Sequence, residues 1–465
     1  MRINILLEKL IYVAKKSKTD FAIHMNLVPS GLSKILAGTR LPSIKDRMTF
    51  TRHAADYFSE AIYSRDCHIK LKSIFPVIYE FKTRNNFHAF LVDAITLALD
   101  LSYASENGLD LNYADDRGMY YTGSRMVMHQ LCIALSDCVI DSTDEPLEVF
   151  VSFPLSDNAY TKMFKDMIWF NTETPTKPVI NYFFDPTLMN DLSNSNKNSF
   201  FQFIANSQNH FDLNLYKARV KPEIFLLVKG KLLLLLYLQD GNNTPVLIPT
   251  YSKSHINIFY NKIINGGSEK ISYSRSEAID LLEKNPQLVD LLINRGIDSV
   301  YNFTSIGYLL TRQDFNAAQY NPVICDAMLK LFSAVLTGKT TLLNISVNAM
   351  ENFSVHGNLV IPLIGIMTLP SEKRTAYMKR FDEYLSGDYY SKVKILSGEL
   401  SNIAMIYSQD MCLIYTVDDT SGREKIHILE NMAFNMQMHE ETHTTIELTS
   451  DIWSIYLNKL INDSN

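Results

Sequence analysis

Cysteine is scarce in this sequence, and the few cysteines rule out two common uses of that residue. The chain has five of them in 465 residues, an odd number with no paired spacing of the kind that holds zinc. They are Cys67, Cys132, Cys138, Cys325 and Cys412. We therefore expect free and mostly buried thiols rather than disulfides or a metal site. With no signal peptide before the first amphipathic stretch, these thiols indicate a reducing cytoplasm.

Long uninterrupted apolar runs are also missing, which argues against a membrane span. The longest, PEIFLLVKGKLLLLLYL, is interrupted by Lys229 and Lys231 on either side of Gly230. A membrane-spanning helix needs about 20 apolar residues without such charges. The pattern instead predicts a β-hairpin that turns at Lys229-Gly230, and we expect no membrane partner.

Glycine and proline are few as well, at 17 and 15 residues, and no stretch is of low complexity. Disorder is therefore expected only in the last residues, NDSN. With 46% hydrophobic and 20% charged residues, the chain has enough apolar surface for two or three domain cores. We find no internal repeat in the sequence.

Charge is distributed unevenly along the chain. The whole sequence carries a formal net charge of −6, but residues 1–65 hold eleven lysines and arginines against five acids and so carry +6. The remainder of the chain then carries −12. A basic head, as we call residues 1–65, on an acidic remainder is typical of a protein whose head meets a polyanion.

The head contains a stretch, SKTDFAIHMNLVPSGLSKILAGTRLPS, in which local signals for two short helices agree. Ser17 followed by Asp20 predicts the start of the first helix, as in a capping box. Asn26 stands where the backbone must turn through a left-handed conformation, which asparagine tolerates. Pro29 suits the first position of a second helix, and Gly38 suits its end. The residues predicted to face inward are Phe21, Ala22, Met25, Leu27, Leu32, Ile35 and Leu36.

This stretch resembles the helix-turn-helix of the lambda-repressor-like (XRE) family of DNA-binding domains. The resemblance rests on SGLSKILAGTRLPS, with its small or polar start, S-x-I, hydrophobic pair and basic residue before P-S. The flanks agree, since NILLEKLIYVAKK predicts a preceding helix, and Ser43, three residues before Asp46, predicts a cap for a fourth. The chain departs from the family at Asn26, where the family has glycine, and at Val28, where a polar cap worth about 1 kcal/mol is lost. Gly31 is a further departure, because glycine is a poor helix former.

The resemblance implies which residues meet DNA. Ser30, Ser33 and Lys34 match the outward face of the second helix, which reads base edges in the major groove, and lysine suits the O6 and N7 atoms of guanine. The residues that match phosphate-contacting positions are Lys18, Thr39, Arg40 and Lys45. Because one long base reader gives weak binding, we expect a homodimer on two half-sites of double-stranded DNA. The alternatives are a small helical bundle that matches the family by chance and a degenerate module that serves only assembly.

Beyond the head the pattern is first helical and then mixed. Residues 66–146 have helical periodicity and predict a helical connector, a candidate dimerisation element. Its apolar face consists of Phe87, Phe90, Leu91, Ala94, Ile95, Ala98 and Leu99. From residue 147 strands alternate with helices, which argues against the all-helical sensor of peptide-pheromone regulators. The expected fold is multidomain α+β: an all-α helix-turn-helix domain at 1–65, the connector, and a larger mixed α/β body at 147–465.

The segment 333–341, SAVLTGKTT, ends like a phosphate-binding loop. That loop requires glycine where Ser333 stands, and the residues between continue the apolar face of a helix. Gly338 is better explained as the C-cap of this helix. We therefore expect no bound nucleotide and no other cofactor.

A second motif, HEETH at 439–443, matches the H-E-x-x-H pattern of zinc hydrolases. Those enzymes place both histidines on one face of a helix and need a third ligand. Here TTIEL follows, whose alternating β-branched residues disfavour a continuing helix, and no third histidine stands at a suitable spacing. The sequence predicts a polar turn between two strands and no metal.

These patterns favour a cytoplasmic, sequence-specific regulator of transcription, controlled by a small-molecule or protein effector bound to the body. No Ser/His/Asp, Cys/His or paired-carboxylate constellation can be assembled from the sequence, so no enzymatic site is predicted. Two alternatives remain: a defence-type effector or enzyme that uses the head for recruitment or autoregulation, and an inhibitor whose helix-turn-helix makes protein contacts only. Duplex binding that depends on salt would distinguish the transcription regulator from both alternatives.

Overall fold

The computed structural model describes most of the chain. The described residues are 1–106, 120–140, 146–153, 177–184, 203–204, 207–208, 210–218, 223–238, 245–302, 307–339, 341–361, 363–386, 393–397, 403–408, 411–418, 421–430, 444–446, 455–456 and 458–460. Helices and sheets both contribute, so the fold is mixed α+β, as predicted. The motif at 439–443 lies outside the described residues.

The chain forms two compact units. Unit 1 comprises Met1–Phe183, His210–Asp212 and Lys221–Ser268, and unit 2 comprises Phe184–Asn209, Leu213–Val220 and Glu269–Asn465. Unit 1 thus contains the head, the expected connector and the first part of the expected body. The boundaries at residues 65 and 146 stay predictions.

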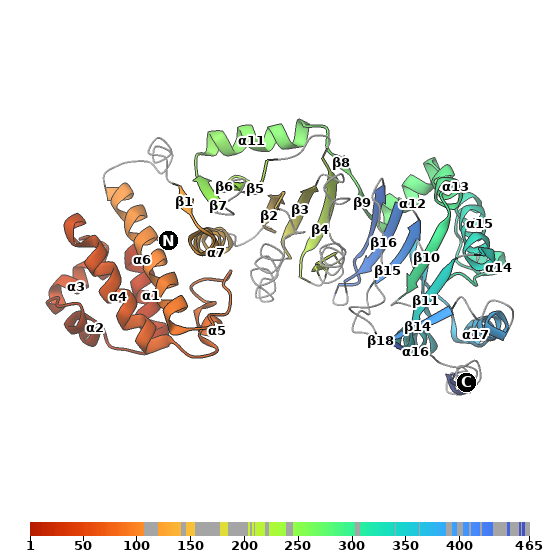
Figure 1. Cartoon of the computed structure of the whole chain (residues 1–465), viewed down its shortest axis with the longest axis horizontal. Coiled ribbons are helices and arrows are strands. Elements are labelled where there is room, and N and C mark those ends of the chain that lie inside the picture. The colour runs from red at the N-terminus through yellow and green to blue at the C-terminus, as the bar shows by residue number, and fades with distance from the viewer. Residues whose placement is uncertain are drawn as a thin grey trace. The chain divides into compact units, whose positions relative to one another are not determined.

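Unit 1 begins with helices, coloured red to orange in Figure 1. They are α1 (Ile3–Ala14), α2 (Lys18–His24), α3 (Pro29–Leu36), the 3-10 turn η1 (Ile44–Asp46), α4 (Arg47–Ile62), α5 (Cys67–Leu71), α6 (Arg84–Glu106) and α7 (Ser124–Ile140). All seven residues of the predicted apolar face of 66–146 lie on α6 and are buried, which confirms that periodicity. α6 packs against α1, α4 and α7, so the head shares its apolar core with α6.

α6 is also long and apolar enough to pass a test for a membrane-crossing helix, the one such helix found in the described part of the chain. Half of its most apolar window is buried against the rest of the structure. A core helix passes the same test, so this helix alone is weak support for a membrane span.

The strands of unit 1 lie in the order β1-β7-β6-β5-β2-β3. Their bounds are β1 (Tyr121–Thr122), β2 (Glu148–Val151), β3 (Val179–Phe184), β5 (Phe225–Val228), β6 (Leu232–Leu238) and β7 (Pro245–Thr250). β5 and β6 form the predicted hairpin: Gly230 has a φ of +70°, and the N–H of Lys231 donates to the Val228 carbonyl at 3.0 Å. Helix α11 (Lys253–Asn265) lies beside these strands in Figure 1. The rings of its Phe259 and Tyr260 contact those of Phe225 on β5 and Phe150 on β2.

Unit 2 is built around the sheet β18-β14-β11-β10-β15-β16-β17-β9. The strands are β9 (Ser272–Ser274), β10 (Ile297–Asn302), β11 (Leu342–Ser346), β14 (Val393–Ser397), β15 (Ile403–Ser408), β16 (Met411–Val417), β17 (Glu424–Glu430) and β18 (Thr444–Ile446). β18 confirms that residues 444–446 are extended rather than helical. Two further antiparallel pairs are β4 (Asp212–Lys217) with β8 (Glu269–Lys270) and β12 (Asn358–Ile361) with β13 (Gly365–Thr368).

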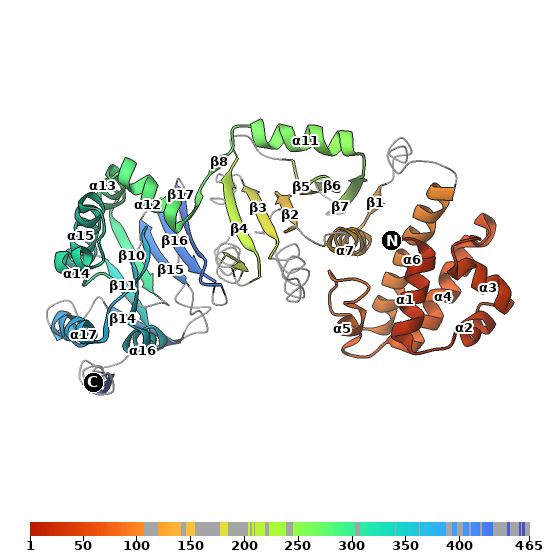
Figure 2. The same cartoon turned by 180° about the vertical axis from the view of Figure 1, so that it is seen from behind.

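Helices cover one face of the unit 2 sheet, and Figures 1 and 2 show α13, α14 and α15 along it. The helices are α12 (Arg275–Lys284), α13 (Gln287–Asn294), α14 (Arg312–Ala317), α15 (Pro322–Thr337), α16 (Val347–His356) and α17 (Ser371–Ser386). Alternate residues of the strands, such as Ile406, Leu413 and Ile426, join the apolar core under these helices. α12 begins with a complete capping box between Ser274 and Glu277.

The two units repeat one arrangement of strands. The order β1, β7, β6, β5, β2, β3 in unit 1 matches β9, β17, β16, β15, β10, β11 in unit 2. In each set the first four pairings are antiparallel and the last is parallel. A helix, α7 or α12, follows the short edge strand in both. The fold thus contains a repeat that the sequence does not show, because many different residues satisfy the same alternation of apolar and polar positions in a strand.

Candidate nucleic-acid interface

The local signals in the head produce the two short helices that the sequence predicts. Ser17 Oγ accepts a hydrogen bond from the Asp20 N–H at 3.0 Å and so caps α2. Asn26 has a φ of +52°, the left-handed turn expected there. Pro29 is the first residue of α3, and Gly38, with a φ of +70°, lies just beyond its end. Each of these positions is confirmed.

One predicted cap is wrong. Ser43 makes no side-chain capping bond, and residues 44–46 form the 3-10 turn η1 instead of the first turn of α4. α4 begins at Arg47, after Asp46, which makes no capping bond either. A 3-10 turn tightens the entry to a helix and leaves the serine one turn too early to serve as its cap.

The inward residues of α2 and α3 form a small core with α4. Phe21 is fully buried, and its ring lies 4.8 Å from that of Phe58 and 5.2 Å from that of Tyr57, measured between ring centroids. Ala22, Met25, Leu32, Ile35 and Leu36 are buried as predicted, whereas Leu27 is half-buried. This packing fixes the direction in which the opposite face of α3 points.

The outward face of α3 carries the three residues predicted to contact bases. Ser30, Ser33 and Lys34 are all exposed. Their spacing of three and four residues places them on one side of the helix. The structure therefore brings this predicted set together on one accessible helical face.

The residues predicted to contact phosphates are exposed but differ in their partners. Lys18 forms an ion pair with Glu8 on α1, with 3.0 Å between Nζ and Oε1. Because both side chains are more than half exposed, this pair is weak and can exchange for a phosphate. The Thr39 hydroxyl donates to the Lys34 carbonyl at 3.1 Å, so that hydrogen is already used. Arg40 and Lys45 form no ion pair with another described residue.

A shallow groove of about 230 Å³ runs beside this face. It lies between α1, α2 and α3, and its lining includes Lys18, Thr19, Ser33 and Glu8. The groove places Lys18 next to the face that is predicted to contact bases. Sequence reasoning missed Glu8, since nothing in the pattern of α1 shows that this acid faces the start of α2.

Polar contacts fix the head to α6. Arg47 forms an ion pair with Asp100 at 2.5 Å, and the Tyr103 hydroxyl donates to the Pro42 carbonyl at 2.7 Å. Burial raises the pKa of the Asp100 carboxyl, and the guanidinium of Arg47 opposes that shift. The position of α3 is thereby tied to the helix that the sequence identifies as a connector.

The other motifs supply no site among the described residues. α15 ends at Thr337 with Gly338 as its C-cap, which confirms the helix predicted through residue 336 and the predicted role of Gly338. A phosphate-binding loop instead precedes a helix and uses the N–H groups at its start. Within the described ranges, no group of three or more His, Cys, Asp or Glu could hold a metal ion.

Changing the zinc-like motif should leave the protein unaffected. We expect His439→Ala and Glu440→Ala to bind a DNA duplex as the unchanged chain does, and purified protein to hold no stoichiometric zinc. Metal analysis by mass spectrometry checks this. One zinc per chain, lost in His439→Ala, would establish a metal site and support the enzymatic alternative.

Comparison with models of known protein families and with curated proteins found no match. The resemblance of the head to lambda-repressor-like domains stays a prediction.

Proposed function

We propose that this chain is a sequence-specific regulator of transcription that binds double-stranded DNA through the head. The observation that carries the proposal is the exposed face of α3, with Ser30, Ser33 and Lys34 on one side of a packed helix. A net charge of +6 on the head supplies the attraction to phosphates. Homodimerisation on two half-sites and control by an effector bound beyond residue 147 belong to the same proposal, as does a cytoplasmic location.

A second candidate function is protein contact through the same two helices. Val28 is 67% exposed at the start of α3, and Ile23 on α2 is exposed to the same extent. Exposed apolar side chains are typical of protein interfaces and add nothing to phosphate binding. An inhibitor that docks on another protein would use these side chains, and its binding would depend little on salt.

The DNA proposal predicts two different losses of affinity. Lys34→Ala should lower discrimination between a specific and a random duplex by about 1–3 kcal/mol, because one bidentate base contact is lost. Arg40→Ala should weaken binding to both duplexes about equally and reduce the salt slope by about 1, because one phosphate contact is lost. Fluorescence anisotropy across a salt series, with a duplex selected from a random pool, measures both.

The matched control is Arg65→Ala, which also removes one positive charge from the head but no predicted contact. It should change neither discrimination nor the salt slope beyond a small screened effect. The variants are made in the full chain, since removing the head would expose the apolar surface of α6. Equal effects of Arg65→Ala and Arg40→Ala, or a duplex affinity indifferent to salt, would overturn the proposal.

A further inference from the structure

Unit 2 contains a groove of about 270 Å³ that no sequence motif marks. Its floor is apolar: Ile271 and Ile428 are buried at 7% and 6% exposure, and Leu281 on α12 and Leu288 on α13 are half-buried. Leu291 stands at the groove with 47% of its surface exposed. An apolar floor that opens to solvent is stabilised by covering it with an apolar group.

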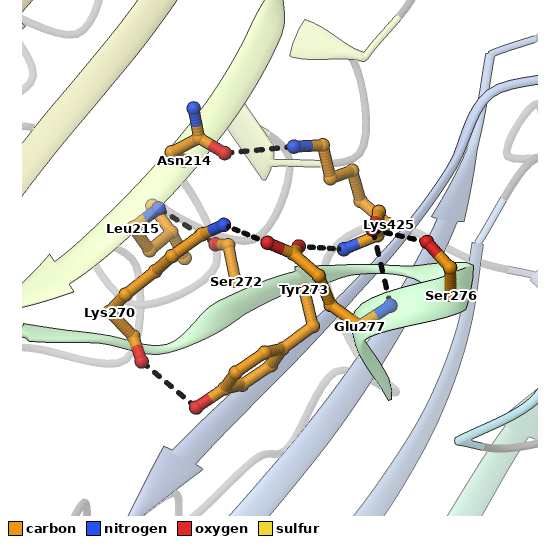
Figure 3. A network of polar contacts seen from close by, with 9 residues as sticks. Asn214, Leu215, Lys270, Ser272, Tyr273, Ser276, Glu277 and Lys425 are labelled. Carbon is orange, nitrogen blue, oxygen red and sulfur yellow. Dashed lines mark hydrogen bonds and ion pairs between the residues drawn. The ribbon is translucent and has the colours of Figure 1, made fainter. Parts of the chain in front are cut away.

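Polar contacts hold residues 270–273, of which Ile271 and Tyr273 line the groove, and Figure 3 shows several of these contacts. Lys270 forms an ion pair with Glu277 at 2.8 Å, and the Tyr273 hydroxyl donates to the Lys270 carbonyl at 2.9 Å. On the strand side, Ser272 Oγ accepts from the Leu215 N–H at 2.7 Å. A groove fixed in this way is already formed before a ligand arrives, which lowers the entropic cost of binding.

Lysine 425 adds a further contact between strands. Its ammonium group donates to Asn214 Oδ1 at 2.8 Å, so β17 is joined to β4 by a side-chain bond, as Figure 3 shows. β4 in turn pairs with β8, which leads directly into β9. The segment of β8 and β9 that lines one side of the groove is therefore held by its two neighbouring strands, β4 and β17.

The charges at the rim are paired, and the ion pair of Glu430 is the longest of them. Lys217 lies directly opposite Glu269 in the β4–β8 pair, so these two charges compensate each other. Glu430 is 37% exposed, and its ion pair with Arg295 is long, at 3.9 Å. Burial, and to a lesser extent the carboxylates of Glu269, Glu277 and Glu430, raises the pKa of Tyr273.

We propose that the groove binds a small organic cation, with an ammonium group at Glu430 and an apolar body of about the size of a phenyl ring over Leu288 and Ile428. An ammonium group donates up to three hydrogen bonds, and its bond to a carboxylate is stronger than one between neutral groups. Binding itself does not depend on DNA. Only the assignment of this cation as the effector rests on the proposed function.

Three probes with one apolar body and different charge test the site in the full chain: phenethylamine, 2-phenylethanol and 3-phenylpropionate. By titration calorimetry the amine should bind about tenfold more tightly than the alcohol, because the charge-assisted bond to Glu430 is added. The carboxylate should bind more weakly than the alcohol. Three equal affinities, or no heat from the amine at millimolar concentration, overturn the proposal.

Variants locate the binding. Glu430→Gln should bring the amine to the affinity of the alcohol and leave the alcohol unchanged. Leu288→Trp should fill the groove and weaken both. The control is Asp280→Asn, an exposed carboxylate on α12 outside the groove, which should alter neither. A loss of amine affinity in Asp280→Asn equal to that in Glu430→Gln would show general charge attraction and overturn the site.

The DNA experiment separates this site from the proposed function. If the amine binds with the expected dependence on Glu430, the site stands even where Lys34→Ala leaves duplex binding unchanged. If Lys34→Ala lowers discrimination and the amine does not bind, the site alone is overturned. A duplex affinity that changes with saturating amine in the unchanged chain, but not in Glu430→Gln, supports its assignment as the effector site.

Discussion

Replacing Gly365 with alanine is expected to destabilise unit 2 by an amount on the order of 2–5 kcal/mol. Gly365 has a φ of +86°, and an added Cβ would overlap the carboxylate of Glu424. That carboxylate has little freedom to move: its Oε2 accepts from the Ile366 N–H at 2.7 Å and from the Tyr415 hydroxyl at 3.2 Å. Its Oε1 accepts from Arg275 at 3.2 Å. Steric overlap is thus added to backbone strain.

The matched control is Gly296→Ala. Gly296 has a similar φ of +81°, but an added Cβ would meet nothing within 4 Å. Its cost should be the backbone strain alone, about 1–2 kcal/mol. Urea denaturation measures both losses, and hydrogen exchange of residues 358–368 locates the larger one in the β12–β13 hairpin. Equal losses of unfolding free energy in the two variants would show that the Glu424 side chain can move away from the added Cβ, and would contradict the expectation.

The elements that the sequence predicts well are those set by neighbouring residues. The start of α2 at Ser17, the left-handed Asn26 and the proline at the start of α3 all depend on local backbone chemistry. The apolar face of α6 follows a period of 3.6 residues, so it can be predicted from the sequence equally well. Ser43 shows the limit of this approach, since its spacing from Asp46 fits a capping box, whereas residues 44–46 form a 3-10 turn and Ser43 makes no capping bond.

The candidate interface could be predicted only in part. Periodicity identifies Ser30, Ser33 and Lys34 as the outward face of α3, because the inward residues are apolar. The partners of the basic residues are not readable in this way. The ion pairs Lys18–Glu8 and Arg47–Asp100 join side chains on different helices, and their geometry follows from tertiary packing.

Neither the groove in unit 2 nor the internal repeat could be predicted from the sequence, and the reason is the same for both. Lys217, Leu288 and Glu430 lie far apart in the chain and meet only because β4, α13 and β17 are brought together. The repeat preserves the order and direction of strands, which are properties of pairing rather than of residue identity. Neither leaves a motif of fixed spacing.

A buried histidine should make unit 2 sensitive to acid. His427 is fully buried, and its Nδ1 lies 2.6 Å from Ser272 Oγ. That oxygen also accepts from the Leu215 N–H, and its second lone pair or its own hydrogen completes the hydrogen bond with Nδ1 in either tautomer of the neutral imidazole. Burial, and to a lesser extent the charge of Lys425, lowers the pKa of His427 from 6.5 to about 3. The folded unit therefore requires neutral imidazole.

The stability of the chain is consequently expected to fall as the pH drops from 6.5 towards 3. Between these pH values His427 is protonated in the unfolded chain but stays neutral in the folded chain. The free energy of unfolding therefore falls by about 1.4 kcal/mol per pH unit, or on the order of 4 kcal/mol in all. His427→Gln, which can still accept from Ser272 but does not titrate, should be less stable at pH 7 and should lose this part of the pH dependence. Urea denaturation at pH 4.5, 5.5 and 6.5 measures the difference in slope between the two chains, which removes the contribution of carboxylates common to both.

The control is His356→Gln, at an exposed histidine of the same unit, which should keep the original slope. Parallel slopes for the unchanged chain and His427→Gln would mean that His427 accepts a proton in the folded state, and the expectation would be wrong.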